Sequence, residues 1–339
     1  MSSSKGAMIR KAGRWLPGVF ISIVLLVVVF RVAKWDDLGD AFTYIRWPYI
    51  LAALALTMAS LLTKSAAWRT LLGNAPGYWQ TFFIVNEGYF LNNILPFRAG
   101  EVGRAIFMGQ SSKKGAMHVI STIVIERAFD VAMAASLLLA TLPLTLGMAE
   151  AKSAAVTTMI LVVAGFGALF LMARFNEQVK DLVNRVGGRW PLVQKWIVPR
   201  IDSLLEGLKV LTRPSQFFAA VAWSLVTWVF WVGIYYVMLL SIAPNAPLWW
   251  GAFVDSFLAM GMAIPSAPAG LGVFEASIVF ALSLLKVDAA KALAYAISLH
   301  FMQFVTTAIF GLIGLLREGR SISVLFEGME KKEQPDTIS

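Results

Sequence analysis

The sequence predicts an all-α protein that crosses a lipid bilayer several times, and three observations support this fold class. Of its 339 residues, 58% are hydrophobic and only 14% are charged, whereas soluble domains are about 45–50% apolar and about 25% charged. The mean hydropathy is +0.71. Long apolar stretches also recur along the chain, with lengths close to the roughly 20 residues that span a hydrocarbon core. A soluble fold would have to bury all of these stretches.

Six apolar stretches are expected to be membrane-spanning helices. They cover residues 17–32, 47–72, 117–146, 154–173, 216–242 and 289–316. The first stretch lacks a small-residue cleavage site and is expected to remain as a span. Two further apolar stretches, residues 81–110 and 249–285, are interrupted by Pro and Gly, which break helices. The expected breaks are at Pro96 and Gly100 in the first of these stretches, and at Pro265, Pro268, Gly270 and Gly272 in the second.

The basic residues predict the orientation, because Lys and Arg favour the cytoplasmic side of a membrane. They cluster before the first span, after the first broken stretch, between residues 174 and 213, and after the last span. All of these clusters lie in the cytoplasm only if each broken stretch enters and leaves the membrane on one side. We therefore expect six crossings, two re-entrant hairpins and cytoplasmic termini, in a plasma or bacterial inner membrane. The alternative is eight crossings, with both broken stretches passing through.

A span, a broken hairpin and a second span follow one another twice, in residues 47–146 and in residues 216–316. The first hairpin would enter from the cytoplasm and the second from the outside. Inverted repeats of this kind build the mid-membrane substrate sites of secondary transporters from discontinuous helices. The broken segments LPFRAGE and APAGLGVFE also resemble each other. We expect one transmembrane domain over residues 1–316, with an amphipathic cytoplasmic linker over 176–214 and a polar cytoplasmic tail over 317–339.

Composition argues against several classes of function. The chain has no cysteine, which excludes thiol catalysis and Cys-bound metals. Its two histidines, His118 and His300, lie far apart with no carboxylate at helical spacing, which argues against a metal site. The net charge of +9 is concentrated at the edges of apolar segments, where it favours anionic lipid head groups over nucleic acid. We expect no cofactor, no metal and no nucleic-acid partner.

The first broken stretch concentrates polar residues that a bilayer disfavours. An ionisable side chain in a span costs about 2.5–3.5 kcal/mol, so it usually faces a partner or a cavity. Arg98, Glu101 and Arg104 recur at intervals of three, so a helix would place Glu101 between two arginines. A helix that begins near Gly100 would add its unpaired N–H groups and the positive end of its dipole. The pattern predicts a phosphate site; the alternative is a structural ion-pair cluster. The candidates in this stretch also include Asn86, Glu87, Asn92 and Asn93.

A second charged element, ERAFD, lies near the start of the next span. Glu126 and Asp130 are one helical turn apart, and Arg127 lies three residues before Asp130. We expect these side chains to complete polar walls around a head group. The alternative is that Arg127 extends to the interface with Asp130 as its only partner. The second hairpin also contains Asp255, and Glu275 follows the break within an apolar run and is the candidate there.

At these residues the chain resembles a known family. NNILPFRAGEVGR (92–104), ERAFD (126–130) and PSAPAGLGVFE (265–275) resemble motifs of the lysylphosphatidylglycerol synthase transmembrane, or flippase-like, family, in the same order. That family includes the N-terminal flippase domain of multiple peptide resistance factors. The similarity covers residues 47–316, although members more often have Pro-Gly-Gly where this chain has Pro268, Ala269 and Gly270. No aminoacyl-transferring domain is expected, so the resemblance implies lipid handling without lipid modification.

Taken together, these features predict a lipid flippase or scramblase-like transporter rather than an enzyme. Its substrate would be an anionic phospholipid or a polyprenyl-phosphate lipid, with Arg98 and Arg104 on the phosphate and the carboxylates balancing the charge. No GxxxxGK[ST] motif is present, so an ion gradient, the membrane potential or the lipid gradient would drive transport. Two alternatives remain: a non-transporting partner of a lipid- or glycan-modifying enzyme, and a membrane-embedded lipid-phosphate transferase.

Overall fold

The computed structural model describes residues 20–29, 31, 35–95, 99–112, 114–146, 148–187, 190, 194, 198–264 and 266–319. Within these residues the regular structure is entirely helical, which confirms the all-α class. Three of the predicted site residues, Pro96, Arg98 and Pro265, lie outside the described residues. So does the tail from residue 320 onward.

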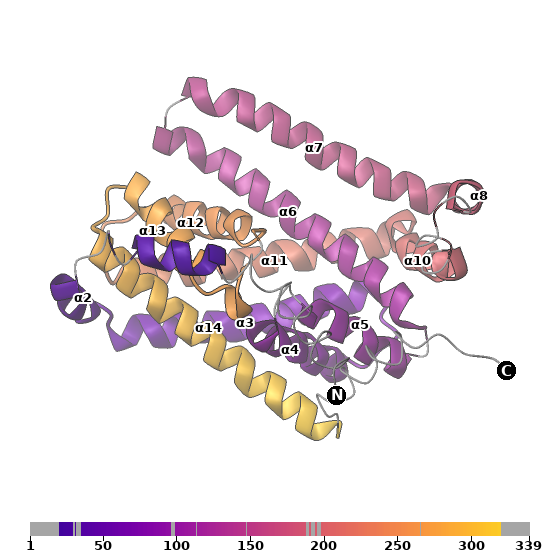
Figure 1. Ribbon diagram of the computed structural model, residues 1–339, viewed down its shortest axis with the longest axis horizontal. Helices are drawn as coiled ribbons and strands as arrows, with labels where there is room; N and C mark the ends of the chain where they lie inside the picture. Colours follow the sequence, from indigo (N-terminus) through magenta and orange to yellow (C-terminus); the bar gives the residue numbers. More distant parts are fainter. Residues whose placement is uncertain are drawn as a thin grey trace, which may run out of the picture.

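Five long helices account for five of the predicted spans. They are α3 (Trp47–Leu71), α6 (Ala116–Leu146), α7 (Met148–Arg174), α11 (Pro214–Leu239) and α14 (Ala289–Arg317). By length and composition, α3, α11 and α14 are long and apolar enough to cross a membrane. The long helices run mainly along the long axis of the molecule (Figure 1). A shorter apolar helix over Phe20–Val29 falls within the predicted first span.

The outer faces of the long helices are apolar. Val229 on α11 and Phe301 on α14 are each 69% exposed, and Leu161 on α7 is 67% exposed. A soluble monomer rarely presents apolar surface of this extent, whereas a bilayer accommodates it. The exposed side chains therefore agree with a bundle surrounded by lipid.

Local sequence signals set where several of these helices begin. Prolines occupy the first turns of α3 and α11, where the missing N–H would have no helical partner in any case. Asp288 caps α14, because its Oδ1 accepts hydrogen bonds from the N–H groups of Ala290 and Lys291, each at 3.1 Å. Asp288 thus marks the start of α14, directly before its apolar run.

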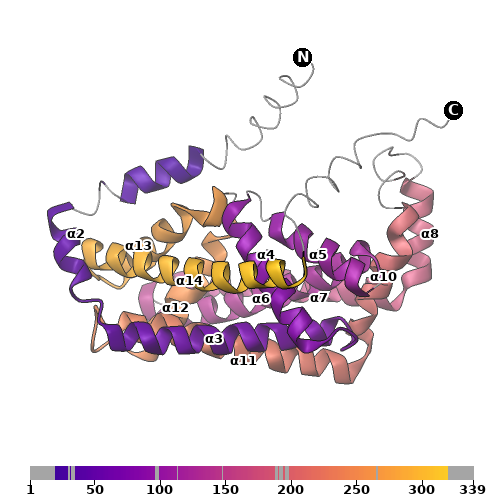
Figure 2. The same ribbon diagram turned by 90° about the horizontal axis from the view of Figure 1, so that it is seen from below.

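Each broken stretch forms a pair of short helices. The first pair is α4 (Tyr78–Ile94) and α5 (Ala99–Ser112); the second is α12 (Leu248–Gly261) and α13 (Val273–Leu284), with the 3-10 turn η3 (Pro268–Gly270) between them. The longest, α4, has 17 residues and measures about 26 Å, short of a hydrocarbon core of roughly 30 Å. The two pairs lie in opposite halves of the long axis in both views (Figures 1 and 2).

Short helices occupy the two ends of the molecule. At one end lies α2 (Trp35–Phe42), and at the other lie α8 (Asn176–Gly187) and α10 (Ile201–Leu208), followed by the 3-10 turn η2 (Lys209–Thr212) (Figure 1). The apolar residues that predicted an amphipathic linker include Ile201, Leu205 and Leu208. All three are buried where α10 packs on α6.

The helices pack in a regular pattern of pairs. α3 runs along α11, α4 packs on α14, and α12 packs on α6. The second limb of each hairpin lies against the long helix that follows it, α5 on α6 and α13 on α14. Two clusters of buried hydrophobic side chains result, one centred on α11 to α14 and the other on α3 to α6.

Candidate functional site

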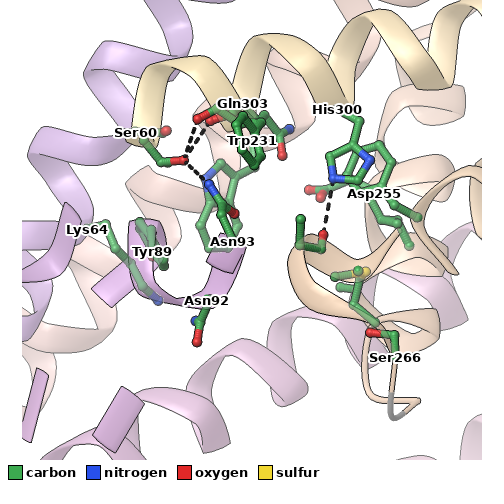
Figure 3. A pocket seen from close by; sticks show the side chains of 18 of the residues that line it. Ser60, Lys64, Tyr89, Asn92, Asn93, Trp231, Asp255, Ser266, His300 and Gln303 are labelled. Atoms are coloured by element: carbon green, nitrogen blue, oxygen red, sulfur yellow. Dashed lines mark hydrogen bonds between the residues drawn. The ribbon is translucent and has the colours of Figure 1, made fainter. Parts of the chain in front are cut away.

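A cavity of about 520 Å³ lies between the two helical hairpins. One wall comes from α3, α4, α5 and α6, and the other from α11, α12, α14 and the loop that joins α12 to α13. Figure 3 shows polar side chains from both walls turned toward this space. The volume is in the range of ligand pockets, roughly 300–1,000 Å³.

Glu126 on α6 is the centre of an ion cluster at this cavity. Its Oε2 lies 2.7 Å from Nη2 of Arg104 on α5, and its Oε1 lies 3.0 Å from Nζ of Lys64 on α3. The same Oε1 accepts a hydrogen bond from Nη2 of Arg127 at 2.9 Å. The Lys64, Arg104 and Glu126 side chains are each at most 3% exposed. One carboxylate thus joins cations from three helices.

Asp130 and Glu101 complete this ion cluster. Asp130 Oδ2 lies 2.8 Å from Lys64 Nζ and 3.0 Å from Arg127 Nη2. Glu101 Oε1 lies 3.7 Å from Arg127 Nε. Arg127 therefore has three carboxylate partners, which contradicts the alternative that Asp130 is its only one. The prediction that Glu101 pairs with Arg104 is wrong, because Glu126 reaches Arg104 from the neighbouring helix.

The ion cluster is electrically balanced, with three cations and three carboxylates: Lys64, Arg104, Arg127, Glu101, Glu126 and Asp130. Balance of this kind is needed because an unpaired charge in a buried site is strongly destabilising. Even so, one N–H donor of Arg104 is not used in the ion cluster. Its Nε is buried and has no hydrogen-bond partner among the described residues. A donor of this type at a cavity wall is suited to an anionic oxygen.

The positions of Arg104 and of the first hairpin depend on close backbone packing. The stem of Arg104 passes over Gly88, where an added Cβ would overlap it, and its guanidinium stacks on the Trp68 ring at 4.0 Å. Gly100 approaches the Gly88 carbonyl so closely that a Cβ there would overlap the oxygen. Asn92 Oδ1 accepts a hydrogen bond from the Gly100 N–H at 2.8 Å. The expectation that the first N–H groups of α5 are unpaired is therefore wrong at Gly100.

The opposite wall carries a buried His300–Glu275 pair. His300 Nδ1 on α14 lies 2.6 Å from Glu275 Oε1 on α13, and His300 Nε2 lies 3.1 Å from the Ala269 carbonyl oxygen. Glu275 Oε2 also accepts a hydrogen bond from the Gly272 N–H at 2.8 Å. The Phe274 ring stacks on the imidazole at 4.3 Å. These contacts tie the loop after α12 to α14, as seen for His300 in Figure 3.

Asp255 on α12 is a further charged residue at the cavity. It is 5% exposed, and its Oδ2 has no hydrogen-bond partner among the described residues. On the neighbouring helices, Gln303 Nε2 donates to the Tyr235 hydroxyl at 3.1 Å. The Tyr295 hydroxyl donates to the Tyr235 carbonyl at 2.7 Å. This wall therefore carries fewer ionisable side chains than the wall that holds the ion cluster.

The structure brings part of the predicted site to the cavity. The predicted residues that line it are Asn92, Asn93, Glu101, Arg104, Arg127 and Gly270. Glu126, Asp130 and Glu275 lie one layer behind and hold the side chains that do line it. Asn86 and Glu87 are buried where α4 packs on α14, beside Gly311 and Gly314. At the second break, Gly270 and Gly272 have positive φ angles and Pro268 begins η3.

Several lining residues were missed from the sequence. The most polar of them are Lys64, Tyr89, Trp231, His300 and Gln303. Most stand alone in an otherwise apolar segment, so no local pattern marks them. One general signal was available for Lys64, because an ionisable residue inside a predicted span is itself a reason to expect a functional or paired position.

Comparison with known proteins agrees with this architecture. The family model described as "Lysylphosphatidylglycerol synthase TM region" matches residues 15–311. The UPF0104 membrane protein MJ1078 of Methanocaldococcus jannaschii is 24% identical over 231 residues, which cover 66% of this chain and 92% of that protein. The UPF0104 membrane protein MJ1595 of the same organism is 25% identical over 120 residues, 34% of this chain and 36% of that protein. No solved structure matches the chain. The chain therefore belongs to the lysylphosphatidylglycerol synthase transmembrane-region family, as its motifs indicated.

Proposed function

We propose that this protein moves a phosphate-bearing lipid between the two leaflets of a membrane. The observation that carries the proposal is the cavity between the two hairpins, which presents polar and charged side chains among apolar ones inside a bundle with an apolar exterior. Such a cavity offers a head group a polar environment while the acyl or prenyl tails stay in the lipid. The protein would then act as a flippase or scramblase-like transporter, with no covalent step.

The ion cluster provides the phosphate-binding groups of this proposal. Arg104 has an unsatisfied Nε, and the Arg127 side chain is 32% exposed at the cavity. Guanidinium groups bind phosphate oxygens through directed, charge-assisted hydrogen bonds. The amides of Asn92 and Asn93 line the same wall. An anionic phospholipid and a polyprenyl phosphate share the chemistry that these groups recognise.

We infer that the helices α3 to α6 and α11 to α14 are two inverted copies of one unit. Exchanging α3 with α11, α4 with α12, α5 with α13 and α6 with α14 reproduces the main packing pairs of the bundle. In both halves a buried pair of ionisable side chains ties the second hairpin limb to the next long helix, Arg104–Glu126 in one and Glu275–His300 in the other. Inverted halves of this kind allow a central site to open alternately to the two sides.

The topology of the proposal rests on the lengths of the hairpin helices and on the positions of the basic loops. The hairpins would be re-entrant and enter from opposite sides, with six full crossings and both termini in the cytoplasm. Helices of 12 to 17 residues in the hairpins support this arrangement, since a full crossing needs about 20. The membrane would be the cell membrane, where the basic loops face the cytoplasm.

Leaflet exchange in liposomes tests the proposed transport. Purified protein is reconstituted with head-group-labelled phosphatidylglycerol, or with a labelled polyprenyl phosphate, and exchange is followed by quenching the outer leaflet. Arg104→Lys and Arg127→Gln are each expected to slow exchange by about tenfold or more, because each loses a charge-assisted hydrogen bond to phosphate. Arg213→Gln is the matched control, since Arg213 is exposed at the start of α11 and does not line the cavity.

Each outcome of this assay has a defined meaning. Equal exchange in the cavity variants and in the Arg213 control would overturn the phosphate site. No exchange with either lipid, for protein that is monodisperse in detergent, would overturn transport. Chromatography of the extracted lipids is run in parallel, and a modified lipid without exchange would instead favour a transferase.

A further inference from the structure

The loop that joins α12 to α13 is held to α14 by one imidazole ring. Both ring nitrogens of His300 face oxygen atoms, Nδ1 a carboxylate oxygen of Glu275 and Nε2 the carbonyl oxygen of Ala269. A carbonyl oxygen only accepts hydrogen bonds, and a neutral imidazole carries a single N–H. Both contacts are satisfied only when the His300–Glu275 pair holds two protons. The pair is then either imidazolium with carboxylate, or imidazole with carboxylic acid, and Nε2 carries a proton in both cases.

Loss of one proton would remove one specific contact. The remaining N–H must choose between an ionised carboxylate and a neutral carbonyl, and the hydrogen bond to the ionised group is the stronger. The proton therefore stays on Nδ1, beside Glu275. The lone pair of Nε2 then faces the Ala269 carbonyl oxygen, and the hydrogen bond that holds the loop is lost.

Ala269 also has an unfavourable backbone conformation. Its φ of +60° and ψ of −3° lie in the left-handed region, which is unfavourable for any residue with a Cβ. The neighbouring Gly270 and Gly272 have φ angles of +79° and +82°, which glycine adopts without strain. Release of the Ala269 carbonyl therefore frees a strained residue, the one non-glycine residue with a positive φ among residues 266–272.

We propose that His300 is a proton-binding site that controls how the α12–α13 loop closes one wall of the cavity. With Nε2 protonated, the loop is latched to α14; with Nε2 deprotonated, the latch opens. Ile264, Ser266 and Ala267 belong to the same loop and line the cavity, so the latch controls access from this side. The inference goes beyond lipid transport, because it concerns the protein alone and its test needs no lipid.

Other titratable groups surround His300, and the test has to separate them. Glu275 on α13 contacts His300 directly. Asp255 on α12, Tyr235 on α11 and Tyr89 on α4 line the same cavity, and Tyr295 on α14 donates to the Tyr235 carbonyl. The other histidine of the chain, His118, lies on α6 and does not line the cavity. Histidine is the side chain whose ordinary titration falls between about pH 5 and 8, and the two histidines can be replaced one at a time.

Reactivity of one introduced cysteine measures the state of the loop. The chain has no native cysteine, so Ser266→Cys gives a single label site on the full-length protein in detergent. At pH 5.5, labelling by a polar maleimide is expected to be about tenfold slower with His300 present than in the His300→Phe variant, whose ring has no N–H to donate to the Ala269 carbonyl. At pH 8 the two rates should converge. Thiol ionisation changes both rates equally, so the ratio reports the loop. His118→Gln in the same background should behave like the parent protein.

A ratio of the two labelling rates that does not change with pH would overturn the proposal, as would a pH response of the labelling rate that persists in His300→Phe and disappears in His118→Gln. If His300→Phe does not fold, the unsubstituted residue gives the answer by ¹⁵N NMR of the His118→Gln protein. The Nε2 signal of His300 should change from the protonated to the unprotonated type as the pH rises from 5 to 9. A Nε2 that keeps one state throughout contradicts the latch. Neither readout depends on lipid exchange. The proposed role of His300 can therefore fail or succeed independently of the proposed transport.

Discussion

Lys64 is the residue whose burial says most about how charges are accommodated in this bundle. Its side chain is 3% exposed and its Nζ lies within 3.0 Å of both Glu126 and Asp130. The same Nζ sits 5.2 Å from the centre of the Trp231 ring. Two carboxylates from α6 thus balance a cation from α3, and removing the cation leaves the three carboxylates of the ion cluster with only two cations, Arg104 and Arg127.

Replacing Lys64 by methionine is expected to destabilise the protein by about 3–5 kcal/mol, because a buried ion pair loses one partner. Thermal unfolding in detergent measures the loss of stability. The double variant Lys64→Met with Asp130→Asn should recover part of the loss, since one uncompensated charge is removed with it. Lys180→Met is the matched control. Lys180 pairs with Asp202 at 2.8 Å, but this pair is on the surface. The unfolding temperature of the Lys180→Met protein should therefore hardly change. Similar losses for both lysines would contradict this account of the ion cluster.

Ala269 offers a second test at the scale of one residue. Ala269→Gly is expected to increase the free energy of unfolding by roughly 0.5–1 kcal/mol, because relief of the left-handed strain exceeds the greater freedom of glycine in the unfolded chain. Ala267 has an ordinary φ of −59°, so Ala267→Gly should lower stability. The comparison requires only unfolding curves of three proteins. A loss of stability in Ala269→Gly would show that the turn is not strained there.

The candidate site was predictable where the sequence concentrates polar residues and not where it scatters them. Arg104, Arg127, Asn92 and Asn93 belong to dense motifs and do line the cavity. The pairing of Glu101 with Arg104, expected from a spacing of three, was wrong because contacts between helices decide partners and Glu126 lies closer. His300 gave no local signal, since its carboxylate partner is 25 residues away on another helix.

At the scale of elements, the first hairpin depends on the contact between Gly88 and Gly100. The two short helices meet there backbone to backbone, with Asn92 bridging the start of α5. Glycine is required at position 100 because a Cβ there would overlap the Gly88 carbonyl oxygen.

Gly100→Ala is therefore expected to lower the free energy of unfolding by about 1–3 kcal/mol or more, through overpacking against backbone atoms. Gly167 on α7 provides the control, because an added Cβ there meets no atom within 4 Å. Gly167→Ala should raise stability by roughly 0.5–1 kcal/mol, through lower backbone freedom in the unfolded state. Equal effects of the two substitutions would contradict close packing in the hairpin.

The helices themselves were predictable, and their neighbours were not. The long apolar stretches at residues 47–72, 216–242 and 289–316 predicted α3, α11 and α14 closely. The prolines and glycines predicted that the two remaining stretches would form short helices. In a membrane, however, the lipid-facing and protein-facing sides of a helix are similarly apolar. The pattern therefore did not show that α3 would run along α11, or that Lys64 would face inward.

At the scale of the whole molecule, the two hairpins define the proposed topology. If they are re-entrant, the two ends of each hairpin lie on one side of the membrane, and the two hairpins on opposite sides. Exposed positions at these ends include Ala75 and Gln110 for the first hairpin, and Asn245 and Ser283 for the second.

Single cysteines at these four positions, in cells and in inverted vesicles, should label in two pairs: positions 75 and 110 from the cytoplasm, and positions 245 and 283 from outside. Gln110 is preferred to the adjacent Gly109, where a side chain would meet the backbone of Ala116. Opposite accessibility of the two ends of one hairpin would establish full crossings instead, and would remove the inverted arrangement from the proposal.

The neutrality of the ion cluster has an electrical consequence. Because its three cations are matched by three carboxylates, the ion cluster adds no net charge to a head group that enters. A monoanionic head group crossing between leaflets would then carry its own charge through the membrane voltage. At 100 mV, inside negative, that work is about 2.3 kcal/mol in favour of outward movement, close to a fiftyfold bias at equilibrium. Voltage alone would set a direction, unless a proton crosses with the lipid and cancels the current.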